Sequence, residues 1–432
     1  MARTPQRKQE VVVQCDDLSS SSAHPMLRGL LVFAVTYALV ATRKLRFARL
    51  DRPAGAIVGA VLAVALGVIT PDEAAKAVDH TTIVLLFAVM GMGAFLSLDG
   101  FFERAGRLVV ARVRTRRRLV GALVWGAGLL GAVITNDAVC VLLAPLVVEW
   151  IRRDQLPRLP LLAALATGAN TGSVATLVGN PQNMLCGSLG KLHFAPFLLH
   201  MAPVAIVALA INHWLLLAIF KRDLDGDLPE EEAPPKLLTL RSTVTLVVIL
   251  VTVIAYTAGA SLAFTALGGF ALLLVVHRRE PATVWERIDW SVLVFFGALF
   301  VAVDALARSG AAEWAFSHFP LVGARPGLTE WMRAAGIFLV GSNVVTNVPF
   351  ILIVRPEMAK LPDPTLGWEL LAMASTFAGN LTLLGSVANV IVAEKAEPVG
   401  GLRFGEYLKV GAPIALVTTF VGALVLVLFR AS

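Results

Sequence analysis

Charged residues are scarce in this sequence of 432 residues. Asp, Glu, Lys and Arg together make up 16% of it, whereas soluble domains average about 25%. Hydrophobic residues make up 57%, above the roughly 45–50% that is usual in soluble domains. This balance excludes an ordinary soluble domain and predicts a chain that lies largely within a lipid bilayer.

Features of enzymes are also missing. Three cysteines, Cys15, Cys140 and Cys186, are too few for a disulfide framework. No GxxxxGKS or GxxxxGKT loop is present to hold nucleotide phosphates, and neither a nucleophile elbow nor a zinc cluster is found. We therefore expect no enzyme activity and no cofactor. Any transport must draw on a gradient of Na⁺ or H⁺ as coupling ion, or on a partner ATPase.

Long apolar runs fill most of the chain, and a helix needs about 20 apolar residues to cross a bilayer. Ten crossings are predicted, at about 27–42, 53–70, 82–99, 160–189, 195–220, 243–258, 260–276, 291–307, 367–397 and 408–430. Two further stretches, 119–150 and 329–354, are each interrupted by Thr-Asn. We interpret both as re-entrant hairpins, because polar backbone at membrane depth survives only when it is buried or lines a cavity.

Lys and Arg give a net charge of +7, but they cluster between the apolar runs. This placement follows the positive-inside rule, predicts an N-terminus outside the cell membrane, and argues against a nucleic-acid partner. Residues 1–26 are polar with charges of both signs, and we expect a mobile tail there. Residues 221–242, rich in acidic residues and proline, are predicted to be a cytoplasmic linker between the halves.

The two halves of the chain share a pattern. Asp79 and Asp289 each open an apolar run, and Thr-Asn then recurs at Thr135 and Thr346 at nearly the same spacing. The stretches 176–183 and 382–389 both follow the pattern Thr-Leu-x-Gly-x-x-x-Asn. Each half has an odd number of crossings, so the second half should be inverted in the membrane, as in many secondary transporters.

The predicted fold is therefore an all-α polytopic membrane protein with two inverted repeats of about five transmembrane helices each. The first repeat covers 27–220, with a hairpin at about 119–150 and a broken helix at about 160–189. The second covers 243–432, with a hairpin at about 329–354 and a broken helix at about 367–397. Pro181 interrupts the first broken helix, and the second lacks a proline, so we expect its break to be milder.

Four segments carry a family resemblance: ITNDAVCVLLAP (134–145), GANTGSVATLVGNPQN (168–183), TNVPFILIV (346–354) and AGNLTLLGSVANVIVAE (378–394). They resemble signature stretches of the ion transporter superfamily, which includes arsenite permeases, divalent-anion/sodium symporters, citrate carriers and sodium/proton antiporters. The likeness covers about residues 50–430 and is nearest in motif to the arsenite permeases. It implies secondary transport, a small anionic solute and a homodimer.

The hairpin tips are the predicted substrate site, because helix N-termini at mid-membrane bind anions through their N–H groups. The candidates are Thr135, Asn136, Asp137, Thr346 and Asn347. By resemblance they match the Ser-Asn-Thr motifs of the divalent-anion symporters, with Asp137 and Val348 departing from the third position. The alternatives are that Thr and Asn only cap helices, and that Asp137 has a structural role, either in a salt bridge or protonated.

The broken helices are the predicted ion-coupling site, because unwound carbonyls and Asn side chains are hard oxygen ligands. The candidates are Asp137, Asn170, Thr176, Gly179, Asn180, Asn183, Thr382, Gly385, Ser386 and Asn389. The alternative is that Asn and Ser serve helix packing. Asp304 is either a further intramembrane carboxylate or a residue at the interfacial end of its span.

The sequence thus predicts an ion-coupled secondary transporter of a small anion or oxyanion, of the arsenite/antimonite or carboxylate type, that works by alternating access. In the proton-coupled version Asp137 carries the proton. A Na⁺/H⁺ antiporter with Asp137 as its ion site is the second hypothesis. A channel is the third, and it would conduct far faster than a carrier turns over.

Overall fold

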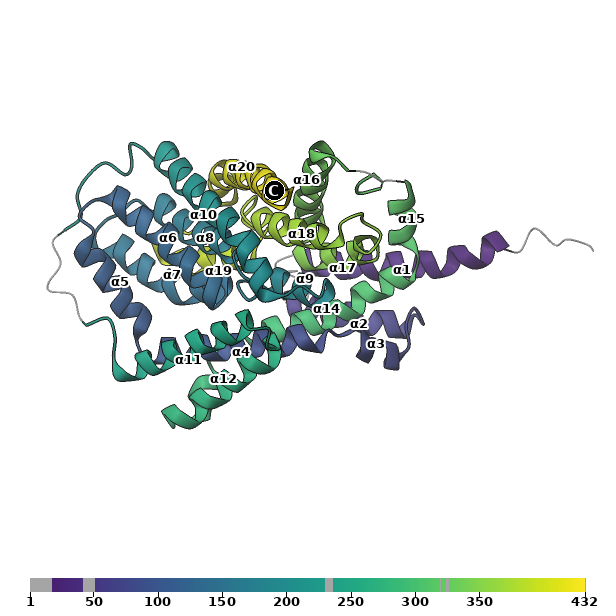
Figure 1. The fold of residues 1–432 in the computed structure, drawn as a ribbon, viewed down its shortest axis with the longest axis horizontal. Helices are drawn as coiled ribbons and strands as arrows, with labels where there is room; N and C mark the ends of the chain where they lie inside the picture. The colour runs from purple at the N-terminus through teal and green to yellow at the C-terminus, as the bar shows by residue number, and fades with distance from the viewer. Residues whose placement is uncertain (1–17, 42–50, 230–235, 319, 324–325, 432) are drawn as a thin grey trace, which may run out of the picture.

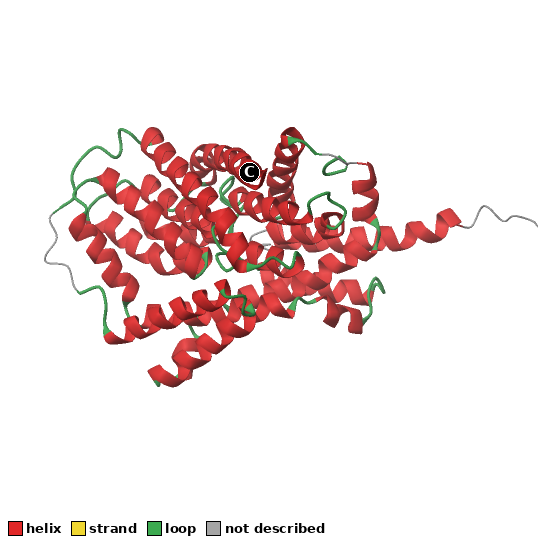
Figure 2. Cartoon of the chain, in the orientation of Figure 1, coloured by secondary structure: helices red, strands yellow, loops and turns green. Residues whose placement is uncertain are grey.

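The computed structural model describes residues 18–41, 51–229, 236–318, 320–323 and 326–431. Within these ranges the chain consists of helices and loops without a β-strand (Figures 1 and 2). The helices are α1 (Leu18–Ala41), α2 (Arg52–Ala65), α3 (Pro71–Ala77), α4 (His80–Leu98), α5 (Phe101–Arg112), α6 (Arg116–Val133), α7 (Asn136–Arg153), α8 (Arg158–Ser173), α9 (Pro181–Leu189), α10 (Phe194–Ile219), α11 (Leu240–Thr257), α12 (Leu262–His277), α13 (Pro281–Trp285), α14 (Trp290–Arg308), α15 (Ala311–His318), α16 (Leu328–Val344), α17 (Asn347–Met358), α18 (Pro364–Ala378), α19 (Val387–Lys395), the short 3₁₀ helix η1 (Glu397–Val399) and α20 (Phe404–Ala431).

The order of elements in α1–α10 recurs in α11–α20. Each half begins with two helices (α1 and α2, or α11 and α12), a short helix (α3 or α13) and a helix capped by aspartate (α4 or α14). A further short helix (α5 or α15), a hairpin (α6/α7 or α16/α17), a broken pair (α8/α9 or α18/α19) and a last long helix (α10 or α20) follow. Asp79 and Asp289 are the N-caps of α4 and α14, and their carboxylates accept hydrogen bonds from Thr82 N (2.7 Å) and Val292 N (3.3 Å). The paired aspartates thus mark equivalent positions. The bounds of the two repeats and their inversion in the bilayer stay predictions.

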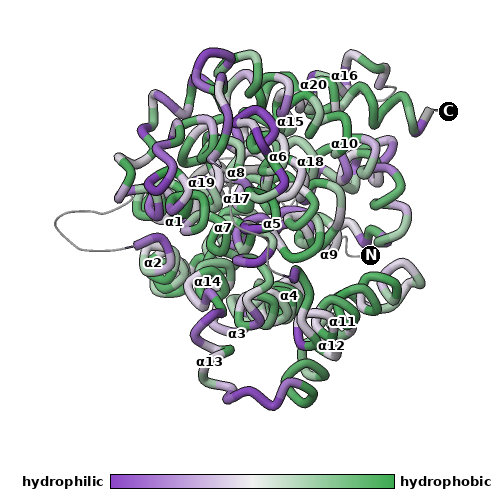
Figure 3. The backbone as a smooth tube through the Cα atoms, turned by 90° about the vertical axis from the view of Figure 1, so that its left-hand side faces the viewer, coloured by the Kyte–Doolittle hydropathy of each residue, from purple (hydrophilic) through white to green (hydrophobic). Residues whose placement is uncertain are grey.

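Five described helices are long and apolar enough to cross a membrane: α4, α10, α11, α14 and α20. Three shorter apolar helices lie where three more crossings were predicted, namely Met26–Val40 within α1, α2 and α12. The remaining two predicted crossings are the broken pairs α8/α9 and α18/α19. Figure 3 shows mainly hydrophobic helices, such as α11 and α12, with many of the hydrophilic segments in the connections. The all-helical membrane architecture is confirmed.

The two halves are packed into each other. Helix α2 of the first half packs on α14 of the second half, and α12 of the second half packs on α4 of the first. The second helix of each half therefore contacts the aspartate-capped helix of the other half. Within the first half α8 lies very close to α6: a Cβ added to Gly172 on α8 would stand only 2.2 Å from the Cα of Gly128 on α6. Small residues allow such approach between membrane helices. The broken-helix segments α8, α9 and α18 are buried along most of their length, with α9 and α18 near the middle of the view in Figure 1.

Some predicted boundaries differ from the structure. Helix α1 begins at Leu18, so residues 18–26 are helical although they were expected to belong to the mobile tail; residues 1–17 lie outside the described residues. Polarity indicated where the membrane span begins, which need not be where the helix begins. The first hairpin extends over α6 and α7, beyond the expected 119–150 at both ends. Helix α11 begins at Leu240, inside the expected linker.

Candidate functional site

Both hairpin tips turn at a threonine with an unusual backbone. Thr135 joins α6 to α7 with φ 118° and ψ 141°, and Thr346 joins α16 to α17 with φ 65° and ψ 158°. This region is normally left to glycine, and each such residue costs about 1–3 kcal/mol and persists only where its surroundings impose it. Two β-branched residues in this conformation at equivalent tips indicate that the shape of the tips is enforced by the surrounding structure.

The tips rest on the gaps of the broken helices. Asn136 N–H donates to Gly179 O at 2.9 Å, and the Asn347 amide Nδ2 donates to Gly385 O at 3.3 Å. Thr176 reinforces the first contact by donating its hydroxyl to Ala132 O at 2.6 Å. Each predicted tip therefore meets the glycine of its own half's predicted break.

Both helices are broken as predicted, but the second break is not milder. The chain leaves the helix over 174–180 in the first half and over 379–386 in the second. Only glycine fits at position 179, because a Cβ there would stand 2.0 Å from Ser173 O. The second break forms without a proline because Asn389 Nδ2 stabilises it by donating to Gly379 O (2.7 Å) and Thr382 O (3.0 Å).

Asn183 plays the same part in the first half. Its Nδ2 donates to the carbonyl of Thr176 at 2.9 Å and to those of Ser173 and Val174 at 3.2 and 3.3 Å. The carbonyls expected to be freed for an ion are therefore already hydrogen-bonded by an asparagine in both breaks. This is the packing role that the sequence left open, and it belongs to Asn183 and Asn389.

Asn170 joins the two halves. Its Oδ1 accepts from Asn136 Nδ2 (2.8 Å) and from the Ser386 hydroxyl (3.1 Å). Its Nδ2 donates to Asn380 Oδ1 (3.1 Å) and Asn389 Oδ1 (2.9 Å). These side chains are buried. The tip of the first hairpin and the second broken helix thus meet at the side-chain amide of Asn170 on α8.

Asn180 makes a second link between the halves. Its Nδ2 donates to Ser173 Oγ at 2.8 Å and to Thr376 Oγ1 at 3.1 Å. The Thr376 hydroxyl in turn donates to Asn183 Oδ1 at 3.2 Å. Thr376 is in no predicted set, because it lies within an apolar stretch of α18 and the motif begins after it.

Four buried amide oxygens around the tips have no hydrogen-bond partner within the described part of the chain. They are Asn136 Oδ1, Asn343 Oδ1, Asn347 Oδ1 and Gln182 Oε1, and the residues Asn136, Asn347 and Gln182 are 3%, 7% and 9% exposed. A buried hydrogen-bond acceptor without a partner lowers the stability of the fold by about 1–3 kcal/mol, so native proteins contain few of them and each calls for an explanation. Neutral oxygens of this kind suit a hard cation or a solute donor.

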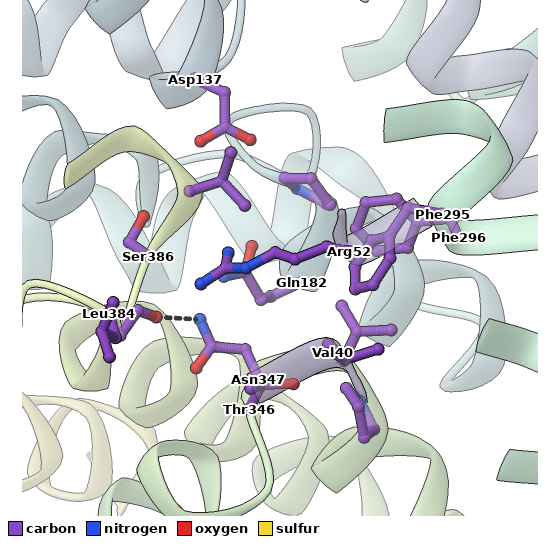
Figure 4. A pocket seen from close by; sticks show the side chains of 15 residues that line it. Val40, Arg52, Asp137, Gln182, Phe295, Phe296, Thr346, Asn347, Leu384 and Ser386 are labelled. Carbon is purple, nitrogen blue, oxygen red and sulfur yellow. Dashed lines mark hydrogen bonds between the residues drawn. The ribbon is translucent and has the colours of Figure 1, made fainter. Parts of the chain in front are cut away.

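Two cavities adjoin the tips. The smaller, about 60 Å³, is lined by the two tips, by the second break and by α14; its polar and charged residues are Arg52, Asp137, Gln182, Thr346, Asn347 and Ser386 (Figure 4). The larger, about 550 Å³, lies between α4, α7 and the Glu286–Asp289 segment. Asp137 and Pro181 line both. Asp137 is half-buried, and Ala388 N–H hydrogen-bonds its carboxylate.

The predicted residues therefore fall into two groups. Asp137, Thr346, Asn347, Gly385 and Ser386 line the small cavity, and Thr135 lines the large one. Asn136, Asn170, Thr176, Gly179, Asn180, Asn183, Thr382 and Asn389 form or support the hydrogen-bonded framework behind it. Whether the first group binds solute or ion stays a prediction.

Two other charged residues complete the picture. Asp304 lies near the end of α14, bonded to Arg308 Nε at 2.6 Å, and Arg308 also contacts Glu73 at 2.8 Å. Asp304 thus belongs to an ion-pair cluster, and its depth in the membrane stays a prediction. Arg52 was in no predicted site, but its side chain lines the small cavity. Because the equivalent residue of the other half, Leu262, is uncharged, comparison of the halves did not reveal it.

Comparisons with known proteins agree on one class. The sequence profile of the CitMHS family, described as citrate transporter, matches residues 37–378. A protein named silicon efflux transporter LSI3 from Oryza sativa subsp. japonica is 30% identical over 94% of this chain and 98% of its own. A putative transporter arsB from Dictyostelium discoideum is 25% identical over 92% of both. The crystal structure of the YdaH transporter of Alcanivorax borkumensis matches with TM-score 0.52 at 16% identity, covering 94% of this chain and 98% of that one.

Proposed function

This chain belongs to the CitMHS citrate transporter family of the ion transporter superfamily, and we propose that it is an ion-coupled secondary transporter of a small anion or oxyanion. The class, a multi-pass membrane transporter rather than an enzyme, follows from the family and its relatives. The solute and the coupling ion are the proposal. One relative is named a silicon efflux transporter and another a putative transporter arsB, so silicic acid and arsenous acid are among the solutes to test.

One observation carries the proposal: both tips and the second break meet at one cavity that holds a carboxylate, an arginine and unpartnered amide oxygens. A site shared by two repeats can open alternately to either side when one part moves against the rest. We assign the proton to Asp137, because a carboxylate within a membrane site usually marks an ion or proton pathway.

Na⁺ is the other coupling ion that this site would suit. We assign it to Asn347 Oδ1 and Gln182 Oε1, because both residues line the small cavity, both oxygens lack a hydrogen-bond partner among the described residues, and Na⁺ prefers oxygen ligands. The same feature supports the second candidate, a Na⁺/H⁺ antiporter in which Na⁺ and H⁺ compete at Asp137. In that case the cavity would bind no solute anion.

Uptake into proteoliposomes tests these assignments together. Purified protein would be offered citrate, a dicarboxylate, sulfate, arsenous acid and silicic acid, each under an imposed H⁺ or Na⁺ gradient. Gradient-dependent, saturable uptake of an anion is the expected result. Na⁺-dependent proton release without anion uptake would instead favour the antiporter, and current far above carrier turnover would favour a channel.

Two partners implied by the resemblance belong to the same proposal. A homodimer would show as twice the monomer mass in light scattering on the detergent-solubilised protein. A partner ATPase would show as uptake that requires ATP in cells but not in proteoliposomes with an ion gradient.

A further inference from the structure

Arg52 brings a positive charge to the small cavity from outside the hairpins. It is the first residue of α2, follows the N-cap Asp51 and is half-buried. Figure 4 shows its guanidinium reaching into the cavity, with the Asp137 carboxylate above it and the Asn347 amide below it in this view. Helix α2 packs on α1 and α14, whereas the cavity's other polar groups belong to the tips and broken helices.

Arg52 and Asp137 are also positions at which the duplicated pattern fails. Leu262 begins α12 at the position of Arg52, at the same spacing that separates Asp79 from Asp289, and Val348 stands at the position of Asp137. Among the cavity's lining residues that the structure describes, these two are the charged ones. Two separate departures from the repeat therefore meet in one cavity, which points to a task that the symmetric parts do not perform.

The chemistry of arginine suits an oxygen-rich anion. Guanidinium stays ionised at any working pH and offers N–H groups in a planar fork that matches two oxygens of a carboxylate or oxyanion. Hydrogen bonds of this charge-assisted kind are about twice as strong as neutral ones. Arg52 also interacts electrostatically with the Asp137 carboxylate. A solute anion would compete with that carboxylate for the same cation.

We propose that Arg52 binds the charged oxygens of the solute and makes the cavity selective for anions over neutral hydroxy acids. The inference rests on the proposed function, since it names the charge class of that same solute. Empty, the site holds one cation and one carboxylate. Loaded, it holds the cation, the anion and a protonated Asp137, so the proton cancels the charge of the carboxylate and the cation offsets one charge of the anion, which lowers the cost of moving charge in the membrane.

The test compares Arg52→Gln and Arg52→Lys with Arg107→Gln, a control on the exposed side of α5. Each variant is reconstituted after its monodispersity has been checked, and KM is measured for citrate, sulfate, arsenous acid and silicic acid. We expect Arg52→Gln to raise KM for the transported anion about 10- to 100-fold, the range for losing a charged hydrogen-bond partner. Arg52→Lys should lie in between, and Arg107→Gln should match the wild type.

The outcomes separate this inference from the proposed function. Unchanged anion KM in Arg52→Gln would overturn the role of Arg52 and leave anion transport standing. Wild-type protein that carries only the neutral acids would overturn both. If Arg52→Gln does not fold, the Arg52→Lys variant tests the role of Arg52, because lysine keeps the charge but lacks the planar guanidinium. A raised KM for the anion in Arg52→Lys supports the proposal, and a wild-type KM overturns it.

Discussion

Asn170 makes four side-chain hydrogen bonds, three of them to the other half, so Asn170→Leu tests how much of the stability depends on this contact. The substitution keeps the number and branching of the side-chain heavy atoms and removes the bonds to Asn136, Ser386, Asn380 and Asn389. At about 0.6–1.5 kcal/mol for each bond, the expected loss in the free energy of unfolding is about 2–6 kcal/mol. The upper part of that range applies because the partners become buried polar groups without partners.

Titration with SDS in mixed micelles, followed by tryptophan fluorescence, measures this loss. Thr167→Val is the matched control, because Thr167 lies one turn earlier on α8 and, outside its own helix, bonds only Asn212 Oδ1 among the described contacts (3.1 Å). We expect the control to lose at most about 1 kcal/mol. If Asn170→Leu unfolds at the same SDS fraction as the control, the bridge does not hold the halves together and the reasoning fails.

Three further results are expected. Asp137→Asn should fold but lose the dependence of uptake on the proton gradient, measured in proteoliposomes at matched membrane potential; full proton coupling in that variant would remove Asp137 from the mechanism. Gly179→Ala should abolish uptake and lower stability, because the new Cβ meets Ser173 O, while Gly126→Ala, with open space around it, should behave as wild type. Glu73, at the start of α3 outside the membrane spans, has its pKa lowered by hydrogen bonds from Thr70 and by Arg308. Its contribution to stability should be present above the ordinary pKa of glutamate and be lost as pH falls through its lowered pKa. Glu73→Gln should therefore reduce the loss of stability at acid pH, measured as the free energy of unfolding against pH.

Local patterns in the sequence predicted most of the fold. Apolar runs gave the positions of the helices, and Thr135 and Thr346 marked the two tips because Thr-Asn interrupts an apolar run in each half. The extent of the second break was wrong because the prediction relied on proline alone. Asn389 holds that break open through hydrogen bonds across the gap, and a side-chain bond of this kind leaves no periodic signal in the sequence.

The candidate site was predicted mainly where it is duplicated. Asn136 and Asn347 belong to matching motifs, so comparison of the halves revealed them, and Asp137 was found because it directly follows the first motif. Arg52 has no counterpart and lies far from the motifs in the sequence, and it reaches the cavity only because α2 packs on α14 of the other half. Packing between the halves, which the sequence does not reveal, brings Arg52 to this site.

Ion-coupled transport would be shown by accumulation of an anion against its own gradient. Proteoliposomes loaded with an anion whose uptake proved saturable, at equal concentration inside and out, would be given an H⁺ or Na⁺ gradient and then an ionophore that collapses it. We predict net accumulation that the ionophore reverses. Flux that only equalises the anion, whatever the gradient, would contradict ion-coupled transport.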